Sequence, residues 1–169
     1  MSRSPRRVNR RTYEMIEKLL TSREFINLAT ADKSGAPNAA PKFLLKFEKP
    51  FIYLIDYSFG RSYDNLRTNP KASLCFMDLD NLEGYRMSGP VELIENGEEF
   101  DKLSKEFQRK TLRLTADRVI EGSRTGKRYE HFELEIPDRF VVIKFRNEEW
   151  TKIGTRGEFF REREGEEKP

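Results

Sequence analysis

The chain has 169 residues, of which 36% are apolar and 36% are charged, which predicts one domain with a real core under a densely charged surface. The net charge of +3 does not favour a whole-protein field that attracts nucleic acid. No apolar run approaches the ~20 residues that span a bilayer, and the basic N-terminus has no apolar segment behind it. We therefore expect a cytoplasmic protein without a membrane span.

The first part of the chain predicts a basic arm, a helix and three strands. Residues 1–11 are rich in arginine and are interpreted as a flexible arm, with a phosphate-contacting arm as the alternative. Thr12 is expected to cap a helix, because Met15, Ile16, Leu19 and Leu20 follow at helical spacing. An antiparallel meander is predicted from three strands, at residues 25–31, 37–47 and 51–57.

The segment from Gly60 to Pro70 is predicted to be a short helix between two strands. Free backbone N–H groups and the helix dipole make the start of a helix attractive to anions. Arg61 and the hydroxyl of Ser62 stand at this start and would complete a cradle for a phosphate. Asn65 lies one turn later and is a further candidate ligand, with a solvated face as the alternative.

The second part of the chain predicts further strands and one longer helix. That helix should run from Glu98 to about Ile120 and be followed by a loop at 122–126. Strands are expected at residues 72–77, 85–95, 129–136, 140–145 and 149–153. Residues 161–169 form a charged tail, so the folded domain should cover residues 12–160. Six or so short strands with few helices are typical of a small barrel with helices at its rim.

Five pieces of this chain, in this order and spacing, resemble the FMN-binding split β-barrel proteins related to pyridoxamine 5′-phosphate oxidase. They are residues 28–37 (LATADKSGAP), 41–46 (PKFLLK), 52–56 (IYLID), 60–70 (GRSYDNLRTNP) and 84–92 (GYRMSGPVE). The resemblance implies a mainly β fold, a six-stranded antiparallel split barrel with Greek-key topology and a few flanking helices. It also implies a homodimer that holds FMN in clefts between the subunits.

The resemblance assigns roles to particular residues. The phosphate would be held by Arg61 and Ser62. The flavin ring would lie along two strands, next to Lys42, Phe43, Leu44, Asp56 and Tyr57. Tyr85 and Arg86 would close the cleft from the other subunit.

Each of these residues also has a purely structural interpretation. Lys42 could point outward from its strand, and Asp56 and Tyr57 could be polar for solubility at a strand end. Tyr85 and Arg86 could form a cross-strand pair.

The other reactive side chains give no strong indication of a further catalytic or metal site. Cys75 is expected to be a buried strand residue, and His131 is the single histidine, so no metal site is predicted. Trp150 is expected to pack at an edge strand. The basic cluster of Arg109, Lys110, Arg113 and Arg118 could meet an anionic partner or form a solvated helix face.

The predicted function is that of a flavin-dependent oxidoreductase that passes hydride or electrons between FMN and a small substrate or NAD(P)H. Residues 137–160 contain one tryptophan and no histidine, unlike the substrate-binding end of the oxidase, so pyridoxamine phosphate oxidation is not favoured. Two alternatives remain: deazaflavin or haem on the same fold, or a sensor or binding module without enzymatic activity. No catalytic side chain is assigned.

Overall fold

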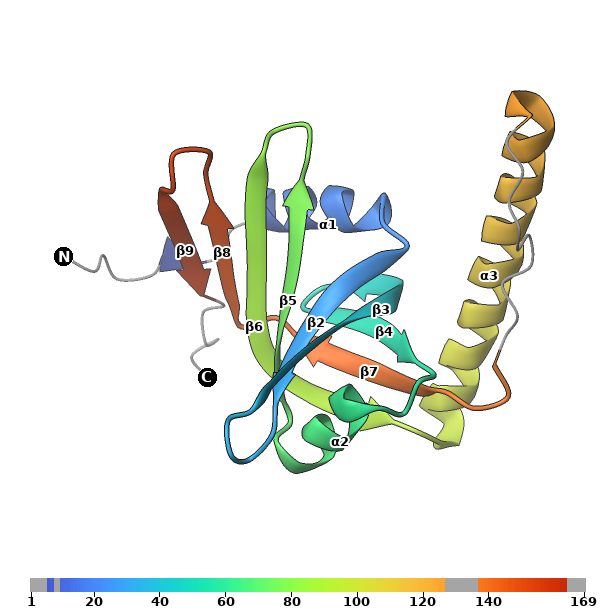
Figure 1. Cartoon of the computed structure of the whole chain (residues 1–169), viewed down its shortest axis with the longest axis horizontal. Coiled ribbons are helices and arrows are strands. Elements are labelled where there is room, and N and C mark those ends of the chain that lie inside the picture. The colour runs from blue at the N-terminus through green and yellow to red at the C-terminus, as the bar shows by residue number, and fades with distance from the viewer. Residues whose placement is uncertain (1–5, 8–9, 127–136, 164–169) are drawn as a thin grey trace.

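A computed structural model describes residues 6–7, 10–126 and 137–163 of the chain (Figure 1). The strand predicted at 129–136 lies outside the described residues. The described residues are mainly β and include three helices, in agreement with the predicted fold class. Helix α1 (Arg10–Thr21) lies across one end of the barrel, the short helix α2 (Arg61–Thr68) lies at the other, and α3 (Gly97–Thr125) stands along the side (Figure 1).

Six antiparallel strands close into a barrel, in the order β6-β5-β2-β3-β4-β7 and back to β6. The strands are β2 (Phe25–Ala31), β3 (Pro37–Glu48), β4 (Phe51–Asp56), β5 (Lys71–Asp78), β6 (Glu83–Ile94) and β7 (Val141–Arg146). β2, β3 and β4 form a meander, and the chain then crosses through α2 so that β5 pairs with β2. This arrangement is a Greek key, and it confirms the predicted fold class.

One edge of strand β6 pairs with β5, and its other edge is divided between two strands, which splits the barrel. Its second half, from Val91 to Ile94, pairs with β7, while residues Gly84–Ser88 pair with β8 (Glu149–Ile153). β8 pairs in turn with β9 (Phe159–Arg163), and β9 with β1 (Arg6–Arg7). β9 therefore runs three residues into the segment predicted as a charged tail, and β1 lies in the predicted N-terminal arm.

Gly89 stands at the point where β6 passes from one partner to the other. A Cβ atom built there would overlap the backbone carbonyl oxygen of Arg146, and it would lie 3.3 Å from the backbone nitrogen of Glu148. The N–H of Glu148 donates to the carbonyl of Ser88 at 3.1 Å, so this close backbone approach is part of the sheet. Glycine is therefore required at this position for space.

Gly89→Ala is expected to destabilise the protein by more than about 2 kcal/mol, because backbone atoms cannot move aside as a side chain can. Gly84→Ala is the matched control in the same strand, since its Cβ would meet Ile153 at an ordinary 3.6 Å. Urea denaturation of both variants tests the prediction, and equal midpoints would contradict it.

The helices differ from the prediction at their ends. α1 begins at Arg10, two residues before the predicted cap Thr12. α3 continues to Thr125 and ends at Gly126, whose φ of 69° is the left-handed conformation typical of a helix end. The predicted loop at 122–126 is therefore wrong for four of its five residues. Gly122 lies inside the helix, and its carbonyl accepts the N–H of Gly126 at 2.9 Å.

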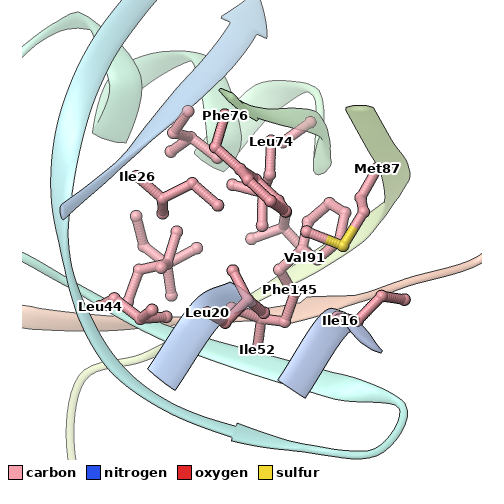
Figure 2. Packing of buried hydrophobic residues seen from close by; sticks show 14 of the residues in the cluster. Ile16, Leu20, Ile26, Leu44, Ile52, Leu74, Phe76, Met87, Val91 and Phe145 are labelled. Atoms are coloured by element: carbon pink, nitrogen blue, oxygen red, sulfur yellow. The ribbon is translucent and has the colours of Figure 1, made fainter. Parts of the chain in front are cut away.

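The core has two parts, one inside the barrel and one outside it. Figure 2 shows the inner part, in which Ile16 and Leu20 of α1 cover one end of a cluster that includes Leu44, Leu74 and Phe145. The outer part lies between α3 and the outer wall of β3, β4 and β7, where Phe107 packs against Phe43 at 5.3 Å between ring centroids. Strands β3 and β4 are therefore covered on both faces.

Candidate functional site

Helix α2 begins without a side-chain cap. Its N-cap is Gly60, which has no side chain to accept a hydrogen bond from the first turn. The preceding residue, Phe59, has a φ of 47°, so the turn from β4 into the helix passes through the left-handed region. Arg61 is exposed and forms no ion pair with a described carboxylate. The start of α2 therefore offers open N–H groups and a free guanidinium, as an anion site requires.

A layer of polar side chains lies beneath α2 and closes this end of the barrel. We call it the polar layer; its members are Thr30, Asn38, Lys42, Asp56, Ser62 and Asn65. Asn38 is partly buried, and the other five are at most 8% exposed. Two hydrogen bonds tie the helix to the strands. Asn38 Nδ2 donates to Ser62 Oγ at 3.0 Å, and Asn65 Nδ2 donates to Thr30 Oγ1 at 3.1 Å.

The polar layer gives Ser62 and Asn65 a different setting from the predicted one. The sequence predicts a phosphate contact for Ser62, and for Asn65 either a ligand contact or a solvated face. Both side chains point toward the barrel beneath the helix, where they are 2% and 8% exposed. Arg61 is thus the member of the predicted cradle that faces solvent. The hydroxyl and the amide fix the orientation of α2, and through it the direction in which Arg61 and the first N–H groups face.

A buried ion pair lies at the centre of the polar layer. Lys42 Nζ is 2.7 Å from Asp56 Oδ2, and the side chains are 5% and 1% exposed. Ser58 donates its N–H and its hydroxyl to Asp56 Oδ1, at 3.0 and 2.7 Å. Lys42 also donates to Ser58 Oγ at 3.3 Å. The pair therefore pins the β4–α2 connection that leads to Gly60 and Arg61.

These contacts set the pKa of Asp56. Burial alone raises it, but the hydrogen bonds from Lys42 and Ser58 outweigh burial and hold the pKa below its ordinary value. Because the folded pKa is depressed, the stabilisation is present above the unfolded value of about 3.9 and is lost as the pH falls through the folded value.

We therefore expect the free energy of unfolding to fall as the pH drops below about 4, with a smaller fall in Asp56→Asn. Urea denaturation from pH 6 down to pH 3 measures both slopes. Identical slopes for the two proteins would contradict the assignment to Asp56.

The residues predicted to run along the flavin ring are divided among three places. Phe43 is 3% exposed and lies under α3, while Leu44 is 1% exposed and points into the barrel. The Phe43 side chain packs in the outer part of the core and the Leu44 side chain in the inner part, so only their backbone could contact a flavin ring. Tyr57 is 52% exposed and follows Asp56 toward the start of α2. Tyr57 and Arg61 are therefore the exposed side chains on this connection among the predicted residues.

Tyr85 and Arg86 lie apart from the start of α2, on strand β6. Tyr85 is 3% exposed, and its ring stacks on Trp150 at 4.9 Å. Burial, then the hydrogen bond to Glu83, raises the pKa of Tyr85, so the phenol stays neutral. Arg86 points to the opposite face, and its nearest carboxylate is Glu149 at 3.9 Å. Tyr85 has little surface left for a ligand, whereas Arg86 remains accessible.

Three residues near the site were not singled out in the sequence. Arg139, from the segment before β7, places its guanidinium 5.0 Å from the centre of the Phe59 ring, beside the start of α2. Nothing in the sequence connects positions 59 and 139. Asn38 and Ser58 complete the polar layer and the ion pair. Asn38 and Lys42 are four residues apart in β3, so strand alternation places them on the same face. This spacing could have indicated from the sequence that the two side chains lie near one another.

A large groove lies elsewhere, on the outer face of β2, β5 and β6. Its volume is about 1020 Å³, and none of the ten predicted site residues lines it. Small side chains form its floor, with Ala29, Ser73 and Ser88 in register across the three strands. It is open to solvent in the single chain, so it resembles a face for another molecule more than a closed ligand pocket.

The described residues contain neither a membrane-spanning helix nor a cluster of metal ligands. No described helix is long and apolar enough to cross a membrane. No group of three or more His, Cys, Asp or Glu side chains in the described part of the chain is placed to hold a metal ion.

Residues 13–154 match the family model of pyridoxamine 5′-phosphate oxidase. The chain belongs to this family. The match covers the barrel, the polar layer and α2. It confirms the resemblance seen in the five sequence pieces, and it extends that resemblance over α3 and β7.

Several solved structures share this fold with the chain at low identity. A Clostridium acetobutylicum protein related to general stress protein 26 is 14% identical over 92% of this chain and 96% of its own, with a TM-score of 0.66. An FMN-binding protein from Nostoc punctiforme is 15% identical over 98% and 100%, with a TM-score of 0.54. PhzG from Burkholderia lata, solved with tetrahydrophenazine-1-carboxylic acid, is 19% identical over 92% and 85%, with a TM-score of 0.58. Comparison with curated proteins gives no match.

Proposed function

We propose that this protein binds FMN and acts as a flavin-dependent oxidoreductase on a small substrate. The observation that carries the proposal is the uncapped start of α2, where Gly60 leaves the first N–H groups open and Arg61 has no described carboxylate partner. A phosphate is the group that such a helix start binds best. The family and its FMN-binding member from Nostoc punctiforme support FMN as the source of that phosphate.

The polar layer fits this role as a support. Lys42, Asp56 and Ser58 hold the connection into α2, and Asn38 holds the helix through Ser62. Lys42 and Asp56 are buried, Asn38 is partly buried, and the exposed Ser58 is bound to Asp56 through its N–H and its hydroxyl. These groups therefore position Arg61 without competing for the phosphate. Arg139 adds a second guanidinium beside Phe59 and strengthens the positive field at the helix start.

The flavin ring would extend from this phosphate along the outer wall toward the exposed Tyr57. Bound FMN would supply the hydride and electron chemistry, and the chain would bind it, orient it and exclude water from one side. α3 covers the wall at Phe43 and Ile55, so the ring has to lie between that helix and α2. This placement uses the backbone of β3 and β4 rather than the predicted Phe43 and Leu44 side chains.

We further propose that the protein is a homodimer that closes this cleft. The groove whose floor is formed by Ala29, Ser73 and Ser88 is open to solvent and has small side chains, so a second copy can approach it closely. On the same face, a second row runs across β5, β6, β8 and β9, in the order Met77, Gly84, Ile153 and Phe159. Met77 and Phe159, at the two ends of this row, are 52% and 67% exposed. Exposed apolar side chains around a small-residue surface favour burial against another chain. Arg86 lies between these two rows and would face the partner.

Three measurements test the proposal. A yellow protein that releases FMN on denaturation, identified by mass spectrometry, is the expected result. Release of a deazaflavin, a Soret band of haem, or a colourless protein that binds no added FMN would contradict it. Oxidation of NADH or NADPH by the FMN-loaded protein would then support an oxidoreductase, and its absence with every donor tried would support a sensor. Sedimentation is expected to give twice the 20.0 kDa chain mass.

A further inference from the structure

A second cavity, distinct from the start of α2, lies where α1, β3 and α3 meet. Its volume is about 540 Å³, within the range of small-molecule sites. The end of α1 and the turn into β2 form one wall, the second half of β3 forms the floor, and the middle of α3 forms the other wall. Of the residues predicted to contact FMN, Leu44 alone lines it.

The lining carries an excess of positive charge. It contains five cationic residues and two acidic ones, namely Arg23, Lys46, Arg109, Lys110 and Arg113 against Glu17 and Glu24. Glu24 is already bound by Arg118, which approaches from outside the lining. Lys46 is likewise neutralised, by Glu106 at 2.9 Å and Glu48 at 3.1 Å. The excess therefore comes from Arg109, Lys110, Arg113 and Arg23.

Arg109 and Arg113 stand one turn apart on α3, so both can reach the same ligand. Arg109 forms no ion pair with a described carboxylate, and it is exposed. Arg113 has Asp117 at 3.9 Å, with both side chains more than half exposed, which is a weak contact. Two guanidinium groups with this spacing are suited to a carboxylate, because each can donate paired hydrogen bonds.

Lys110 lies between them and fixes α3 to the floor. Its Nζ donates to the carbonyls of Leu44 and Leu45, at 2.6 and 3.1 Å, where β3 breaks register with β4 between Leu44 and Lys46. Arg23, on the opposite wall, has a buried Nε with no hydrogen-bond partner among the described residues. The Arg23 guanidinium also donates to the carbonyl of Met77 and lies 4.9 Å from the centre of the Phe76 ring, so its orientation is fixed. The cavity thus has a rigid base.

Besides the charged residues and the hydroxyl residues Thr21 and Ser22, the lining is apolar. Leu20, Leu44 and Leu45 are buried, and Phe47 and Leu114 are partly exposed. We propose that this cavity binds a small organic carboxylate, with its carboxylate on Arg109 and Arg113 and its apolar body against Phe47 and Leu114. Carboxylate binding in this cavity does not require bound FMN, so it can be tested separately from the proposed function.

The test is a titration of the full-length chain, labelled with ¹⁵N, with sodium hexanoate and with 1-hexanol as its uncharged match. Hexanoate is expected to shift the amide signals of residues 44–47 and 109–114 saturably, and 1-hexanol is expected to bind at least tenfold more weakly. The double variant Arg109→Gln/Arg113→Gln should weaken hexanoate binding at least tenfold. Both residues are exposed, so the variant should fold.

The control is Lys102→Gln/Lys105→Gln, which removes the same charge from exposed positions of α3 outside the cavity. It should bind hexanoate as the parent chain does. Three results would overturn the proposal: no saturable shift, 1-hexanol binding as tightly as hexanoate, or equal weakening by the two double variants.

Discussion

Arg61→Ala is expected to weaken FMN binding by more than tenfold. A hydrogen bond between charged groups is worth about 1.5–3 kcal/mol, and each 1.4 kcal/mol is a factor of ten in affinity. Arg61 is exposed and without a described carboxylate partner, so its removal should cost the phosphate contact and little stability. Fluorescence titration of FMN, whose emission changes on binding, measures the effect.

Arg67→Ala is the matched control for this experiment. Arg67 is an exposed arginine in the last turn of the same helix, where it lies over the ring of Tyr63 at 5.7 Å. The Arg67→Ala substitution removes the same charge as Arg61→Ala, but from the C-terminal end of the helix. Its FMN affinity should remain that of the parent chain, and equal losses in the two variants would indicate a general effect of charge instead of a phosphate contact.

Lys42→Met is expected to destabilise the folded protein by about 3–5 kcal/mol, because it leaves the buried carboxylate of Asp56 without its partner. Asp56 is 1% exposed and cannot recover its hydration without opening the barrel end. The loss should be largest at neutral pH, where Asp56 is charged. Urea denaturation at pH 7 gives the free energy.

The double variant Lys42→Met/Asp56→Asn separates the pair from its surroundings. With both charges removed, no unpaired ion remains buried, and most of the stability should return. Ser58 can still donate to the amide oxygen of an asparagine. If the double variant were as unstable as Lys42→Met alone, the loss would come from packing rather than from the unpaired carboxylate.

The barrel could be predicted because its strands are short, apolar and separated by strong turn signals. The run Phe51–Tyr57 and the turn at Asp32–Gly35 illustrate this, and the predicted bounds of β2 and β4 agree with the structure within a residue. The helix at Gly60–Pro70 followed from a glycine at its start and a proline after its end. The order of these pieces identified the family, which no single piece could do.

The inner and outer faces of β3 and β4 could not be predicted. In a barrel with one solvated face, alternation would show which side chains point inward. Here α3 covers the outer wall, so Lys42, Phe43, Leu44 and Leu45 are all buried and the alternation disappears. The pairing of Lys42 with Asp56 was hidden for this reason, since either face was compatible with a lysine.

The contacts between distant segments were also hidden. Tyr85 packs on Trp150 because β8 pairs with β6, and sequence periodicity does not reveal this pairing. The same is true of Arg139 over Phe59. The predicted end of α3 is wrong because Gly122 indicates a break in the sequence, whereas the helix tolerates one glycine at a cost of about 1 kcal/mol.

The most direct test of the central claim compares FMN with riboflavin, which has the same ring and lacks the phosphate. If the start of α2 binds the phosphate, calorimetric titration of the parent chain should give an affinity for FMN at least tenfold higher than for riboflavin, and Arg61→Ala should abolish most of that difference. Equal affinities for the two flavins in the parent chain, or binding of neither, would contradict the account.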